Sequence, residues 1–237
     1  MSFGIVAASY GSNGEELIQP LAAWNFENEV NDMCADVTGN GHVLTRGTYG
    51  AWVTGHNSAV AIQGDPANKQ AELGAGVYGT FPGGSPGSDP FSICFWAQLP
   101  DANGGPCISA YNTVAGRSDP WNISVESDGS VQAWWYSDAD VLNGAPVSMT
   151  TGAVAANTWV HIAGVFVPGS GVTLYVGGVI VTTYGWQGGS SAFYGTWETL
   201  LVGSSRWGSA GVTIDDLRIY HEVLTDTQIT TLMNQPL

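Results

Sequence analysis

The chain has 237 residues and carries 20 Asp and Glu but only five Lys and Arg, which gives a formal net charge of −15. Nucleic-acid binding requires a basic surface that neutralises phosphates, and this composition excludes one. No run of about 18 apolar residues occurs, so we expect no membrane insertion. The three cysteines are an odd number without CxxC spacing, which argues against a closed disulfide framework and a zinc knuckle.

The patterned part of the chain begins near residue 19. We expect residues 1–18 to form an N-terminal arm or a first strand. Residues 19–237 should form one domain, because no shift in composition divides the chain after about residue 19. Short β-branched or aromatic runs bounded by turn residues recur at 21–27, 58–64, 91–99, 121–127, 130–137, 158–167, 171–184 and 198–204. This pattern predicts an antiparallel β-sandwich of a dozen or so strands.

One short helix is predicted at the C-terminal end. Thr225 and Gln228 have the spacing of a capping box, with Thr225 as N-cap and Gln228 at the third helical position. Ile229, Leu232 and Met233 make one apolar face. A helix this short has to be docked on the sheet to persist.

Six segments carry the pattern of a known family. They are AAWNFEN at 22–28, DVTGNGH at 36–42, FSICFWAQ at 91–98, NTWVHIAGVF at 157–166, VTLYVGGVIV at 172–181 and IDDLRIYHEVLTDTQI at 214–229. In this order they resemble the laminin-G-like (LamG) family of the concanavalin A-like lectin/glucanase jelly roll, although Gly177 stands where the family's hairpin usually has Asp. The resemblance covers residues 20–233 and implies an all-β jelly-roll sandwich of two antiparallel sheets, with Trp24, Trp96 and Trp159 packed at core positions.

Two adjacent carboxylates, Asp215 and Asp216, interrupt the last strand pattern. Side chains alternate along a strand, so Asp215 is predicted to face the core beside Leu217 and Ile219. Asp216 is predicted to face the other way and to pair with Arg218. An inward carboxylate persists when it is hydrogen-bonded or bound to a metal.

The family resemblance implies a structural Ca²⁺ ion at this strand. In similar proteins the matching Asp often binds calcium together with groups from the first strand and the Asp-Gly turn. Carried over, the ligands are Asp215, Glu27, Asp36 and the backbone carbonyl near Gly39, and oxygen ligands of this kind suit Ca²⁺. The alternatives are a metal-free Asp215 that accepts backbone N–H bonds and an ordinary Asx turn at Asp36.

Aromatic residues supply the candidate ligand contacts. In the strand VQAWWYS, alternation predicts that Trp135 is buried and that Trp134 and Tyr136 share the more polar face. Such a pair forms a platform of the sort that stacks on sugar rings. Trp186 and Trp207 lie among loop residues and are further candidates, with packing over the sandwich edge as the alternative for each.

No catalytic constellation is found in the sequence. Glucanases of this fold use a Glu-x-Asp-x-x-Glu strand that brings two carboxylates close together, and no such segment occurs here. GxSxG and P-loop motifs are also missing, and a lone strand histidine, His161, is predicted to be structural. We therefore predict a non-catalytic, lectin-like recognition or adhesion module that binds glycans or another cell-surface ligand.

The composition also suggests where such a module acts. The N-terminus lacks the basic region of a signal peptide, Lys occurs once, and Gly and Trp are abundant. This profile suits a component of a virion, such as a phage decoration protein, so we expect a virion-surface or extracellular-facing location, and otherwise a cytoplasmic one. Residues 1–18 would then dock on virion structural proteins. The alternative is a structural capsid or tail decoration protein without glycan binding; a laminarinase-type glycoside hydrolase is less favoured.

Overall fold

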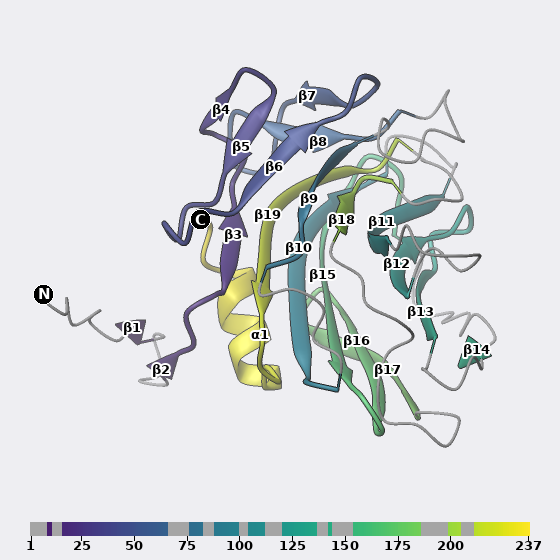
Figure 1. The fold of residues 1–237 in the computed structure, drawn as a ribbon. Helices are drawn as coiled ribbons and strands as arrows, with labels where there is room; N and C mark the ends of the chain where they lie inside the picture. Colours follow the sequence, from purple (N-terminus) through teal and green to yellow (C-terminus); the bar gives the residue numbers. More distant parts are fainter. Residues whose placement is uncertain are drawn as a thin grey trace, which may run out of the picture.

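Two antiparallel sheets packed face to face form the body of the protein in this computed structural model (Figure 1). The structure describes residues 9–10, 16–65, 76–82, 88–99, 104–111, 120–136, 142–143, 154–185, 199–204 and 211–237. Apolar side chains from both sheets meet in one core, whose largest members include Trp24, Trp121 and Trp135. The two-sheet, all-β jelly-roll class that the sequence predicts is confirmed.

The first sheet has eight strands and contains the longest ones. In sheet order they are β17 (Val179–Gly185), β16 (Gly171–Val176), β15 (Trp159–Val167), β10 (Phe91–Gln98), β19 (Thr213–Tyr220), β8 (Ala61–Gln63) and β7 (Ala51–Val53), with β3 (Ala22–Trp24) also paired to β19. β8 pairs with the first part of β19 and β3 with the last part. The neighbour of β19 on that side therefore changes partway along the strand.

The second sheet has nine strands and lies across the core from the first. In sheet order they are β14 (Leu142–Asn143), β13 (Val131–Tyr136), β12 (Trp121–Val125), β11 (Gly105–Tyr111), β18 (Thr199–Val202), β9 (Val77–Thr80), β6 (Val43–Arg46), β5 (Met33–Ala35) and β4 (Glu29–Val30). Every strand run identified in the sequence corresponds to a strand here. The total exceeds the predicted dozen because most of the additional strands have only two to four residues, too few to show a period of two.

A separate two-stranded hairpin precedes the sandwich. β1 (Ser9–Tyr10) and β2 (Glu16–Leu17) pair with each other and with no other described strand. Figure 1 shows them beyond the edge of the sandwich, near the N-terminus. The first strand within the sandwich is β3, and the domain boundary near residue 19 stays a prediction.

The hairpin between β16 and β17 explains the departure from the family motif at Gly177. Gly177 and Gly178 have φ values of +59° and +77°. Tight two-residue hairpins with positive φ at both positions match the twist of the strands, and glycine adopts them without steric cost. Glycine therefore serves here in place of the usual Asp.

Helix α1 (Asp226–Met233) has the predicted capping box. The Thr225 hydroxyl accepts a hydrogen bond from the Gln228 backbone N–H at 3.2 Å, and the Gln228 side chain accepts one from the Thr225 N–H at 2.9 Å. Ile229 and Leu232 are buried, and Met233 remains partly exposed. The helix covers part of the outer face of the eight-stranded sheet (Figure 1), where it packs against Cys94, Val165, Tyr175 and Tyr220. Among the described residues, no helix has the length and apolar character that crossing a bilayer requires.

Candidate functional site

A β-bulge in β19 decides where its two adjacent carboxylates point. Trp96 of β10 pairs with Asp215, whereas Cys94 pairs with Arg218, so two residues of β19 stand opposite one residue of β10. Asp216, inside the bulge, has a φ of +48°, a left-handed conformation that residues other than glycine adopt uncommonly. The alternation of side chains is therefore shifted by one residue beyond this point.

The bulge reverses the predicted orientation of Asp215. Ile214, Leu217 and Ile219 all belong to the core between the sheets. Asp215 instead lies beside Trp96 on the outer face of the eight-stranded sheet. The prediction that Asp215 shares a face with Leu217 and Ile219 is wrong, because it assumed a strand without interruption.

Asp216 lies on the same outer face but does not form the predicted ion pair with Arg218. The Arg218 guanidinium donates to the carbonyl oxygens of Leu232, at 3.2 Å, and Gln235, at the C-terminal end of α1. Its charge thus stabilises the helix end. Among the described residues, no ion pair within 4.0 Å joins Asp216 to Arg218. Asp216 accepts one long hydrogen bond, from the Leu237 N–H at 3.4 Å.

Asp215 is fully buried under the loop of residues 55–58 and is well satisfied there. Its Oδ2 accepts hydrogen bonds from the His56 N–H at 2.7 Å and the Ser58 hydroxyl at 2.6 Å, and its Oδ1 accepts one from the Asp216 N–H at 2.8 Å. Burial raises the pKa of Asp215 to about 6, although the hydrogen bonds from Ser58 and His56 oppose this shift. A side chain at Gly55 would collide with Ser58 and the Asp215 carboxylate, so this loop needs glycine.

Sequence reasoning missed this loop. Its residues, Gly55, His56, Asn57 and Ser58, have no motif spacing, and they are more than 150 residues from Asp215 in the chain. The only signal was Asp215 itself, because a buried carboxylate requires hydrogen-bond donors from somewhere. That requirement predicts that donors exist but not which segment supplies them.

Asp36 closes its own turn. Its carboxylate accepts hydrogen bonds from the Thr38 N–H at 2.9 Å, from the Thr38 hydroxyl and from the His42 N–H at 2.6 Å. Gly39 within this turn has a φ of +82°. These bonds lower the pKa of Asp36 overall, although burial opposes them. The geometry is that of the Asx turn, which was the alternative to a metal ligand at this residue.

The carboxylates predicted as calcium ligands accept hydrogen bonds from the protein itself. Glu27 accepts one from the Val60 N–H at 2.7 Å, in the segment whose His56 and Ser58 donate to Asp215, whereas Asp36 closes its own turn. Among the described residues, no group of three or more His, Cys, Asp and Glu side chains is placed to hold a metal ion. Calcium binding stays a prediction.

Trp134 lies where alternation places it, because β13 is regular. Trp135 is fully buried in the core, and Trp134 is half-buried on the outer face of the nine-stranded sheet. The backbone of Tyr136 ends β13. The side chain of Tyr136, and Trp186 and Trp207 altogether, lie outside the described residues.

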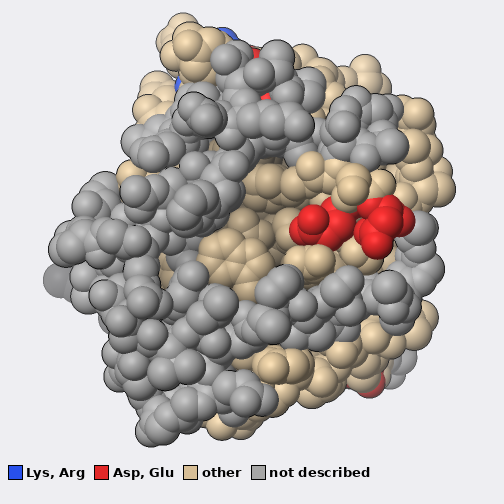
Figure 2. Space-filling view, turned by 90° about the vertical axis from the view of Figure 1, so that its right-hand side faces the viewer, with Lys and Arg blue, Asp and Glu red and all other residues tan. Residues whose placement is uncertain are grey.

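A polar row accompanies Trp134 across the nine-stranded sheet. Trp134 pairs with Asn122 of β12, and Asn122 pairs with Ser109 of β11. Asn122 is only 3% exposed, and within the described part of the chain its amide Oδ1 has no hydrogen-bond partner. Figure 2 looks onto this side of the molecule and shows a hollow with an uncharged described floor and acidic residues at one margin. An indole beside an unsatisfied amide oxygen is a combination that can receive an apolar ring face and a hydroxyl group.

Two of the three tryptophans expected in the core lie elsewhere. Trp24 is fully buried in the core, but Trp96 and Trp159 are partly exposed and flank His56 on the outer face of the eight-stranded sheet. The His56 ring stacks on the Trp96 ring with 3.7 Å between the ring centroids, and its centroid lies 5.6 Å from that of Trp159. His161 packs edge-on against Trp96, and burial lowers the pKa of His161 to about 3, so its ring is neutral.

Comparisons with known proteins agree with this fold. The family model Laminin_G_3, described as the concanavalin A-like lectin/glucanases superfamily, matches residues 73–230. No curated protein gives a significant match to the chain.

Three solved structures illustrate the structural likeness. The binding domain of Paraclostridial Mosquitocidal Protein 1 has a TM-score of 0.65 and 17% identity, over 91% of this chain and 52% of that one. The Botulinum neurotoxin serotype D ligand binding domain in complex with N-acetylneuraminic acid has a TM-score of 0.66 and 10% identity, over 91% of this chain and 50% of that one. Trypanosoma rangeli sialidase has a TM-score of 0.66 and 13% identity, over 93% of this chain and 33% of that one. The chain thus spans half of each toxin domain and a third of the sialidase, and at these identities the likeness shows the fold alone.

Asp215 should give the stability of the protein a measurable pH dependence. Its folded pKa of about 6 lies above the ordinary unfolded value of about 3.9. The contribution of Asp215 to the stability of the folded state is therefore complete below about pH 4 and is lost as the pH rises through about 6. Between these limits we expect the free energy of unfolding to fall by roughly 2–3 kcal/mol from this residue. Urea denaturation at several pH values should show this fall in the wild type and a flatter profile in Asp215→Asn; identical profiles would contradict the assignment.

Calcium addition tests the calcium site that the sequence predicts. A specific ligand at 100 times its Kd adds about 2.7 kcal/mol to the stability of the folded state, so an occupied site should raise the melting temperature in millimolar calcium above that in excess chelator. An unchanged melting temperature would instead identify Asp215 as a hydrogen-bonded carboxylate without a metal. Differential scanning calorimetry measures this directly. A rise with calcium that Asp215→Ala abolishes would establish the calcium site predicted from the sequence.

Proposed function

This chain belongs to the concanavalin A-like lectin/glucanases superfamily, and we propose that it is a non-catalytic recognition module that binds glycans on the outer face of its nine-stranded sheet. The observation that carries the proposal is the buried, unpartnered amide oxygen of Asn122 beside the half-buried ring of Trp134. A buried acceptor without a donor is costly. A ligand hydroxyl that donates to it removes this cost.

The chemistry of the face favours a sugar ring. A pyranose has an apolar C–H face that packs on an indole and hydroxyl groups that donate to an amide oxygen. The net charge of −15 and the acidic margin of the hollow repel polyanions, so we propose neutral glycans as the ligands (Figure 2). The serotype D toxin domain, similar in fold over half of its length, is a complex with N-acetylneuraminic acid. That ligand is a carboxylated sugar, so the likeness supports binding of a sugar and not the choice of a neutral one.

The non-catalytic part of the proposal rests on the sequence. Retaining glycosidases hold two carboxyl groups about 5–5.5 Å apart across the scissile bond. The Glu-x-Asp-x-x-Glu strand that supplies them in glucanases of this fold is missing from the chain. Release of reducing sugar from laminarin or a related glucan panel would overturn this part of the proposal.

Removing the Trp134 ring should abolish most of the binding. We expect a glycan array to identify a neutral ligand and Trp134→Ala to weaken its binding by about tenfold or more, as measured by titration calorimetry. Tyr49→Ala is the matched control, because Tyr49 is an exposed aromatic residue in the turn between β6 and β7. Unchanged binding in Trp134→Ala, or no neutral glycan bound at millimolar concentration, would contradict the proposal.

We further propose that the domain is displayed on a larger assembly such as a phage virion, with residues 1–18 as its docking arm. The β1–β2 hairpin supports this, because it pairs with no described strand of the sandwich. Native purification should then give a large particle. Deletion of residues 1–17, which keeps Ile18 packed against the cluster beneath α1, should release the domain with its melting temperature unchanged. A strictly monomeric native protein would contradict display. A particle-bound protein that binds no glycan would favour a purely structural decoration role.

A further inference from the structure

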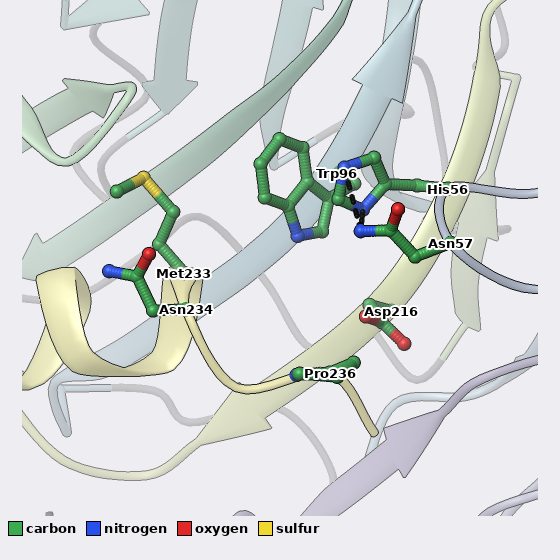
Figure 3. A pocket seen from close by; sticks show the side chains of 7 residues that line it. All are labelled: His56, Asn57, Trp96, Asp216, Met233, Asn234 and Pro236. Atoms are coloured by element: carbon green, nitrogen blue, oxygen red, sulfur yellow. Dashed lines mark hydrogen bonds between the residues drawn. The ribbon is translucent and has the colours of Figure 1, made fainter. Parts of the chain in front are cut away.

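A pocket of about 300 Å³ opens on the outer face of the eight-stranded sheet (Figure 3). Its walls come from the loop at Asn57, from Trp96 of β10, from Asp216 of β19 and from the C-terminal segment 233–236. The Trp134 face belongs to the other sheet, so the pocket and the proposed glycan face lie on opposite sides of the sandwich. The inference below does not depend on the proposed glycan binding.

Asp216 is the feature of this pocket that requires an explanation. The residue is 3% exposed and is held in a left-handed conformation by the bulge. Its carboxylate accepts one long backbone hydrogen bond. The Arg218 guanidinium donates its hydrogen bonds to the carbonyl groups at the end of α1 and acts on Asp216 through its charge alone, without an ion pair within 4.0 Å. A carboxylate removed from water without a cation in direct contact is unfavourable. Strain and desolvation that coincide in a pocket wall are typical of binding sites.

The remaining walls offer hydrogen-bond acceptors and flat surfaces but no cation. The Asn234 amide nitrogen donates to the Thr230 carbonyl at 2.8 Å, which leaves its Oδ1 as an acceptor. The pocket has no Lys or Arg in its described lining, and burial lowers the pKa of His56, so this ring is neutral at neutral pH. Trp96, Met233 and Pro236 supply apolar surface (Figure 3).

We propose that this pocket binds a small, hydroxylated primary amine of monosaccharide size, with its ammonium group on the Asp216 carboxylate. An ammonium group has three N–H donors and no acceptor, which matches a carboxylate flanked by amide oxygens. It supplies a positive charge in direct contact with Asp216, which Arg218 does not, and the charge-assisted hydrogen bond is stronger than a neutral one. The net charge of −15 raises the local concentration of such cations.

The matched pair of D-glucosamine and D-glucose tests the requirement for a positive charge. Titration of the ¹⁵N-labelled protein at pH 7 should give saturable shifts with D-glucosamine, centred on Asn57, the Trp96 indole N–H and Asn234. D-Glucose should bind at least about tenfold more weakly. Equal binding of the two sugars, or no saturable shift at about 10 mM amine, would overturn the proposal.

Four variants locate the site. Asp216→Asn should weaken D-glucosamine binding by at least about tenfold, and Glu222→Gln, which removes an exposed carboxylate outside the pocket lining, should leave it unchanged. Asn234→Asp, at an exposed position, should tighten binding of the amine and not of D-glucose, and it serves if Asp216→Asn does not fold. Binding that is insensitive to Asp216→Asn, or that Asn234→Asp fails to tighten, would overturn the assignment. Trp134→Ala should have no effect here, which separates this site from the glycan face.

Discussion

The bulge in β19 is the constraint on which the chemistry of the eight-stranded sheet depends. It lies where the neighbouring strand changes from β8 to β3, so the ladder on that side is interrupted there. The extra residue is accommodated by a positive φ at Asp216. Core packing resumes beyond it with Leu217 and Ile219, and two carboxylates are left together on the outer face.

The two carboxylates then have different environments, although they are adjacent in the chain. Asp215 is enclosed by the loop at residues 55–58 and accepts three hydrogen bonds. Asp216 faces a pocket and accepts one long bond. The Arg218 guanidinium acts on Asp216 through its charge, but it donates its hydrogen bonds to the end of α1. Asp215 therefore has a structural role, and Asp216 is the residue available to a ligand.

The outer faces of the two sheets differ because one is built from regular strands and the other contains a bulge. On the nine-stranded sheet, regular alternation at β12 and β13 brings Trp134 and the amide of Asn122 side by side without a charged group in the row. On the eight-stranded sheet, an irregular strand places a buried carboxylate in a pocket wall, near an indole and the end of a helix. Regularity thus gives a flat aromatic platform, and irregularity gives a small acidic pocket. One sandwich can present both, because the core isolates the two faces.

The sequence predicted those elements that depend only on residues close together in the chain. The strand runs, the capping box at Thr225 and the separation of Trp134 from Trp135 follow from periodicity or fixed spacing within regular segments. The orientation of Asp215 could not be obtained in this way, because one inserted residue reverses alternation. The partners of Asp215 were unpredictable, since they come from a distant loop whose residues carry no motif.

The bulge itself is tested most directly by comparing Asp216→Gly with Asp216→Ala. Both variants remove the carboxylate, so their difference reports the backbone conformation. At a positive φ, glycine avoids the strain that alanine suffers, and Asp216→Gly should be the more stable by about 1 kcal/mol in urea denaturation. In a regular strand the glycine variant would instead be less stable than the alanine variant by a similar amount. A more stable Asp216→Ala would therefore contradict the bulge and with it the placement of both carboxylates on the outer face.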